Sequence, residues 1–73
     1  MQRFILNRNQ QPNGDNEVHN TTTGCSWMPE LASQIDLGYH LDCRGAVAAA
    51  KNNYPFFKRI NGCAYCCPAC HTT

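Results

Sequence analysis

The sequence predicts a small α+β domain that combines a three-stranded antiparallel sheet, one alanine-rich helix and a C-terminal cysteine knuckle. Three observations predict it: β-patterned segments flanking an Asn-Gly turn, an alanine-rich segment with helical periodicity, and four cysteines within residues 63–70. The chain has 73 residues, which suits one domain, residues 1–73. A core of that size contributes only about 3–5 kcal/mol, so we expect a metal or covalent cross-link to complete the fold.

The sheet is expected to begin with a β-hairpin. Residues 3–8 alternate between two faces as a strand does, and they are followed by a segment dense in turn formers. Within that segment Asn13-Gly14 predicts the hairpin turn, because both residue types tolerate positive φ. Residues 17–20 then form the returning strand.

A third strand and a helix follow. Residues 33–39 alternate cleanly and carry three apolar side chains on one face: Ile35, Leu37 and Tyr39. Asp42 is suited to cap a helix over residues 43–53, which ends before Pro55 because the residue preceding proline avoids the helical region. The helix has a core-facing stripe at helical spacing: Cys43, Ala46, Val47 and Ala50.

Two side chains near these elements are expected in the core. Cys43 lies on the apolar stripe, where a free cysteine behaves as a small hydrophobe. Trp27 is the single tryptophan, and core packing is the simplest interpretation of it.

The overall charge bounds the function. The chain has six Lys and Arg residues and five Asp and Glu residues. The resulting net charge of +1 is too weak for field-driven binding to nucleic acid or membranes. No apolar run approaches the ~20 residues of a membrane span. The apolar run at residues 4–6 is also shorter than the roughly 7–15 residues of a signal peptide, so we expect a cytoplasmic location, with secretion as the alternative. We also expect a monomer.

The cysteine knuckle, residues 63–70, contains two C-x-x-C spacings, Cys63/Cys66 and Cys67/Cys70. Such a loop lets two thiolates converge on one tetrahedral ion, and a reducing compartment favours metal ligands over disulfides. Adjacent side chains such as Cys66 and Cys67 tend to point apart, so a remote ligand is needed. Cys25 follows a glycine in a loop and is the best candidate.

The sequence therefore predicts a structural zinc ion held by Cys25, Cys63, Cys66 and Cys70. The alternate ligands are Cys67, His19 and His71. The competing interpretation is a disulfide framework, since six cysteines form an even set with 15 possible connectivities.

We expect no enzyme activity, because no base–nucleophile–orienter set is evident, and the biological role stays unknown. The main hypothesis is a zinc-binding interaction module whose partner is a protein in preference to a nucleic acid. The alternatives are a secreted, disulfide-stapled antimicrobial or toxin-like peptide and a thiolate-based redox or methyl-acceptor protein. Residues 56–59, Phe-Phe-Lys-Arg, are the one candidate contact patch, although Phe56 and Phe57 are most simply core residues beside solvated charges.

Two resemblances accompany these residues. The pattern resembles a family of small uncharacterised bacterial cysteine-rich proteins, and it runs through Leu6-Asn7-Arg8-Asn9, Gln11-Pro12-Asn13-Gly14-Asp15, Glu17-Val18-His19, Gly24-Cys25-Ser26-Trp27, Cys43, Ala46-Val47, Ala50-Lys51 and Gly62-Cys63-x-Tyr65-Cys66-Cys67-x-x-Cys70-His71-Thr72. That resemblance implies a bacterial, intracellular origin and no established activity.

The second resemblance is to the zinc-binding domain of the Ada DNA-repair protein. It lies in the order of His19, Cys25, a strand, an alanine-rich helix and a closing C-x-x-C. It implies zinc, with Cys25 and two knuckle cysteines as ligands. The close cysteine pair of a methyl acceptor is absent and basic residues are sparse, so only the metal-binding architecture carries over.

Overall fold

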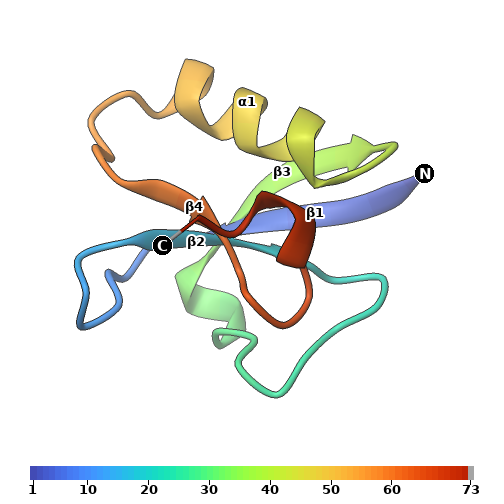
Figure 1. Cartoon of the computed structure of the whole chain (residues 1–73), viewed down its shortest axis with the longest axis horizontal. Helices are drawn as coiled ribbons and strands as arrows, with labels where there is room; N and C mark the ends of the chain where they lie inside the picture. The colour runs from blue at the N-terminus through green and yellow to red at the C-terminus, as the bar shows by residue number, and fades with distance from the viewer. Residues whose placement is uncertain (73) are drawn as a thin grey trace.

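The computed structural model describes residues 1–72 and consists of one sheet, one α-helix and two short 3-10 turns (Figure 1). The elements in chain order are β1 (Gln2–Asn7), β2 (Asn16–Asn20), a 3-10 turn (Leu31–Ser33), β3 (Gln34–His40), α1 (Cys43–Asn53), β4 (Ile60–Gly62) and a second 3-10 turn (Pro68–Cys70). The predicted α+β class, the hairpin, the third strand and the helix are confirmed.

The expectation of a three-stranded antiparallel sheet was wrong, because the sheet has four strands in the order β3-β1-β2-β4. β1 pairs antiparallel with β2 and β3, whereas β4 pairs parallel with β2. β4 has only three residues, too few to show alternation in the sequence. Backbone bonds just outside it extend the pairing: Asn16 N–H donates to Arg59 O at 2.8 Å and Cys63 N–H to Val18 O at 2.9 Å.

The hairpin turn contains one left-handed residue. Gly14 has φ 93°, while Asn13 does not have positive φ. Asn13 instead accepts the Asp15 N–H with its side chain at 2.9 Å, and Gly14 N–H donates to Gln11 O at 2.8 Å. The connection is therefore a longer loop around Gly14 rather than a two-residue turn.

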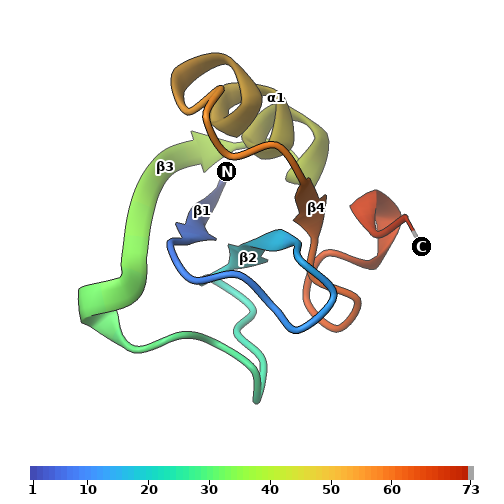
Figure 2. The same ribbon diagram turned by 90° about the vertical axis from the view of Figure 1, so that its left-hand side faces the viewer.

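Helix α1 covers one face of the sheet, and long loops cover the other (Figure 1 and Figure 2). Asp42 caps the helix by accepting the Arg44 N–H at 3.0 Å, as predicted. Between α1 and the sheet lies the apolar core, made of Phe4, Leu6, Val18, Cys43, Ala46, Ala50 and Cys67. Ala46 and Ala50 are fully buried and let the helix lie close to the strands.

A disulfide joins Cys43, at the start of α1, to Cys70 in the second 3-10 turn. The two residues are 27 positions apart, so the bond ties the C-terminal segment to the helix. Cys43 is buried, as its position on the apolar stripe predicts, but its sulfur is bonded rather than free.

Candidate metal centre

Four side chains converge near the end of β2: His19, Cys25, Cys63 and Cys66. His19 lies on the sheet face opposite α1, and Cys66 also packs against the edge of the α1 core. Their ligand atoms all lie within 4.8 Å of one another. Nδ1 of His19 is 3.4 Å from Sγ of Cys66 and 3.7 Å from Sγ of Cys25. The Sγ atoms of Cys25 and Cys63 are 3.9 Å apart, close to the edge of about 3.8 Å that a tetrahedron with 2.3 Å metal–sulfur bonds requires. The group can hold a metal ion.

Strand alternation sets the position of His19. Val18 points into the α1 core, so its neighbours Glu17 and His19 lie on the opposite face of β2. β2 is an inner strand, and His19 is fully buried there. Cys63 follows β4 directly, and its N–H bond to Val18 O holds it beside β2. Parallel pairing of β4 with β2 thus joins two candidate ligands that are 44 positions apart in the chain.

Cys25 reaches the same point through a tight turn after β2. The side chain of Asn20 accepts the N–H groups of Thr22 and Thr23 at 2.9 and 3.2 Å, and Gly24 N–H donates to Asn20 O at 2.9 Å. Gly24 has φ 69°, a left-handed conformation that glycine adopts without steric cost. The loop therefore folds back over the sheet and brings Cys25 to His19.

Backbone N–H groups support two of the sulfurs. Asn20 N–H donates to Sγ of Cys66 at 3.3 Å, and Tyr65 N–H donates to Sγ of Cys63 at 3.4 Å. Cys67 N–H donates to Cys63 O at 2.8 Å, and this bond closes the turn that carries Cys63 and Cys66. Donors of this kind orient thiolate ligands and spread their negative charge.

Burial makes the group neutral without a metal. It raises the pKa of Cys25, and it raises the pKa of Cys63 to about 12. The pKa of Cys66 is also raised, first by its hydrogen bond with Cys67 and then by burial. Burial lowers the pKa of His19, so the imidazole stays neutral and its lone pair is available. A bound cation reverses the preference of the thiols, because it favours their deprotonated form.

The second nitrogen of His19 has no hydrogen-bond partner among residues 1–72, although it is fully buried. The nearest carboxylate oxygen is Oε1 of Glu17, 3.8 Å away. Burial raises the pKa of Glu17. In metal sites the non-ligating imidazole N–H is regularly held by a carboxylate, which fixes the tautomer. Glu17 stands where such a carboxylate is needed, and it is not among the residues predicted from the sequence.

Three of the four predicted ligands, Cys25, Cys63 and Cys66, belong to the group, and His19 joins them from among the alternates. Cys70 lies outside it, because the 3-10 turn beginning at Pro68 carries its sulfur to Cys43. Cys67 is buried in the α1 core. His71 also lies outside, with Nδ1 3.0 Å from Gly62 O.

Trp27 is not a core residue, contrary to the prediction. Its side chain is 62% exposed and stacks on Tyr65 with ring centroids 5.9 Å apart. Trp27 follows Cys25 by two positions, and Tyr65 lies between Cys63 and Cys66. The aromatic pair therefore joins the two loops that carry the cysteines.

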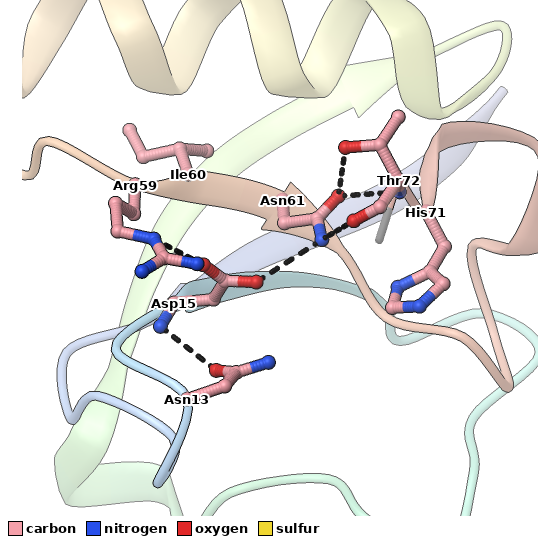
Figure 3. Close-up of a pocket in the computed structure, with 7 residues that line it drawn as sticks. All are labelled: Asn13, Asp15, Arg59, Ile60, Asn61, His71 and Thr72. Carbon is pink, nitrogen blue, oxygen red and sulfur yellow. Dashed lines mark hydrogen bonds and ion pairs between the residues drawn. The ribbon is translucent and has the colours of Figure 1, made fainter.

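A depression of about 470 Å³ lies near the C-terminus, lined by Asn13, Asp15, Arg59, Ile60, Asn61, His71 and Thr72 (Figure 3). Its polar groups bond one another. Asn61 Nδ2 donates to Asp15 Oδ2 at 3.2 Å and to Thr72 O at 2.6 Å, and Thr72 N–H donates to Asn61 Oδ1 at 2.9 Å. This network anchors the C-terminal segment to β4. Because the polar groups of the depression already bond one another, the His/Cys group is the main candidate site.

Comparison with protein-family models, with curated proteins and with solved structures found no match to the chain. Both family resemblances therefore stay predictions. Within residues 1–72 every helix is too short and too polar to cross a membrane.

Proposed function

We propose that the protein is a small zinc-binding module in which the ion is structural and is held by His19, Cys25, Cys63 and Cys66. The convergence of these four ligand atoms from β2, the loop after it and the knuckle carries the proposal. One imidazole and three thiolates form a donor set typical of zinc. Four protein ligands complete a tetrahedron and leave no open position for a substrate, which supports a structural role.

The ion would tie together a face of the sheet that no helix covers. It would join β2 to the loop after it and to the turn between Cys63 and Cys66. Apparent binding free energies of structural zinc are about 10–16 kcal/mol, and this energy stabilises the folded state. A chain this small gains more folding stability from such a cross-link than from its small apolar core.

We further propose that the ordered loops serve as an interaction surface for a protein partner. Trp27 and Tyr65 are 62% and 69% exposed, and Leu31, at the start of the 3-10 turn that follows the Trp27 loop, is exposed as well. Aromatic residues of these types are enriched at protein interfaces. The ion would hold the two loops at the spacing that stacks the two rings.

The decisive experiment is native mass spectrometry of the protein purified under reducing conditions, followed by unfolding with and without a strong chelator. We expect one zinc per chain and loss of the cooperative transition on chelation. A metal-free protein that unfolds cooperatively with its thiols reduced would refute the proposal.

The Cys43–Cys70 disulfide favours a second candidate, the secreted and disulfide-stapled peptide. Sγ of Cys25 and Sγ of Cys63 lie 3.9 Å apart, so a further bond could form there by oxidation. An intact mass lowered by one hydrogen for each of the six cysteines, without metal, would support this alternative over the zinc module.

A further inference from the structure

A second depression, of about 410 Å³, lies away from the metal centre. Its walls are the loop after β1 and the segment between α1 and β4, with Arg8, Asn9, Gln10, Asn16, Phe56, Phe57, Lys58 and Arg59 as lining residues. The volume falls in the range of about 300–1,000 Å³ that is usual for small-ligand pockets. It is open on one side and could admit part of a longer chain.

Hydrogen bonds hold the two walls together. Asn16 N–H donates to Arg59 O at 2.8 Å, at the point where β2 meets β4. The Asn16 side chain donates to the backbone oxygens of Asn7 and Arg8, both at 3.1 Å. The fully buried Asn16 thus fixes the backbone on both sides of the depression, so the pocket is formed before any ligand arrives.

The depression concentrates the positive charge of the molecule. Three of the six Lys and Arg residues line it, namely Arg8, Lys58 and Arg59, and all three are exposed. No carboxylate lines it within residues 1–72. Outside this depression, the Asp15 carboxylate accepts a hydrogen bond from Nε of Arg59 at 2.9 Å (Figure 3). Three cations against one carboxylate leave two positive charges in excess, although the chain as a whole has a net charge of +1.

An aromatic ring stands beside these cations. Phe56 is 66% exposed, so the interpretation of both phenylalanines as core residues was wrong for this one. Phe57 is half-buried against the core and supports Phe56 at 4.6 Å between centroids. Tyr54 meets Phe56 edge-on at 6.2 Å. Phe56 is therefore an exposed ring held in place by two other rings.

We propose that this depression binds single-stranded nucleic acid, with phosphates against Arg8, Lys58 and Arg59 and a base stacked on Phe56. A ligand that uses both features must carry negative charge and a planar π system, which nucleotides combine. The amide nitrogens of Asn9 and Gln10 already donate to Ser33 Oγ and Gly14 O, so these side chains offer their oxygens as acceptors for base edges. The site does not depend on the zinc proposal, because it shares no residue with the metal centre.

The small net charge predicts weak, short-range binding without electrostatic steering. We expect a Kd of about 10⁻⁴–10⁻⁶ M, as for non-specific binding. With two or three phosphate contacts, log K should fall with log salt at a slope of about −1.4 to −2.1 for a single strand.

The test is fluorescence anisotropy with a labelled oligothymidylate at low salt. An abasic strand of the same length should bind at least about 5-fold more weakly, because it offers phosphates without a stacking partner. Thymidine monophosphate and inorganic phosphate should bind more weakly still. Equal binding of the abasic strand overturns the stacking role and the proposal with it. Equal binding of the free nucleotide overturns the assignment to a strand.

Variants locate the binding. Phe56→Ala and Lys58→Gln should each weaken binding of the oligothymidylate by about 5-fold or more. The matched controls are Tyr39→Ala, a residue 64% exposed on β3, and Lys51→Gln on α1, and both should bind as the wild type does. All four substitutions are at exposed positions, and amide chemical shifts check that each variant is folded. Equal losses in variants and controls, or no loss in any of them, would overturn the proposal.

Discussion

The two faces of the sheet are stabilised by different chemistry. On the α1 face, apolar side chains such as Phe4 and Leu6 pack against small helix residues, and Cys43–Cys70 adds a covalent bond. On the opposite face, His19 and the carboxylate of Glu17 lie beside three cysteines, of which Cys66 also contacts the edge of the α1 core. Apolar burial stabilises the first face whatever is bound. The second buries polar groups, which costs free energy until they have a partner. We infer that the α1 face is stable with or without a bound metal, whereas the face with the His/Cys group needs one. We call them the constant half and the conditional half of the fold.

The largest expected effect comes from removing a ligand of the conditional half. Cys63→Ser should abolish stoichiometric zinc and lower the free energy of unfolding by several kcal/mol, since zinc binding and folding are coupled. Native mass spectrometry and thermal unfolding under reducing conditions measure both effects.

The matched control is Cys67→Ala, which removes the neighbouring buried cysteine that packs in the α1 core. It should keep its zinc and lose only a modest amount of stability. A Cys63→Ser protein that binds zinc as the wild type does would contradict the assignment of this ligand.

The next effect tests the constant half. Replacing both Cys43 and Cys70 by alanine removes the disulfide and should lower the unfolding free energy by about 2–5 kcal/mol under oxidising conditions. The zinc content should stay at one per chain, because neither sulfur belongs to the metal centre. Denaturant titration gives the stability. Loss of zinc from this folded variant would show that the two faces are not independent.

A smaller effect tests Glu17 as the residue that positions His19. Glu17→Gln should weaken zinc binding by about 10–100-fold, because the imidazole loses its carboxylate partner. Competition with a chromophoric chelator measures the affinity, and ¹⁵N shifts of the imidazole report the tautomer of His19. The control Glu30→Gln changes an exposed carboxylate of the loop and should have no effect. Unchanged affinity and tautomer in Glu17→Gln would exclude the positioning role while leaving the four ligands in place.

The smallest effect concerns the stacked pair Trp27 and Tyr65, which joins the two loops that carry the cysteines. Trp27→Ala should lower the unfolding free energy by about 0.5–1.5 kcal/mol through loss of the stacking contact with Tyr65. Thermal unfolding of the zinc-bound protein measures it. Leu31→Ala, at an even more exposed position where the following 3-10 turn begins, should change the stability little. Equal effects of the two substitutions would mean that stacking does not join the cysteine loops.

Much of the α1 face was predictable because its determinants are local. Asp42, the alanine spacing and Pro55 mark the helix within fourteen residues, and alternation marks β3. The exposed positions of Trp27 and Phe56 were not predictable in this way. Whether a large aromatic is buried depends on what covers it, and here the loops carrying these rings project from a very small core.

The sequence by itself determined the α+β class, the helix and its cap, and the candidacy of Cys25, Cys63 and Cys66 as metal ligands. The tertiary structure decided the fourth member of the group. Spacing alone favoured Cys70, but the 3-10 turn at Pro68–Cys70 carries that sulfur to α1, while parallel pairing of β4 with β2 brings Cys63 to His19. The physical reason is that C-x-x-C spacing is a local property, whereas the meeting of β2 with a three-residue strand more than 40 positions later depends on the whole sheet.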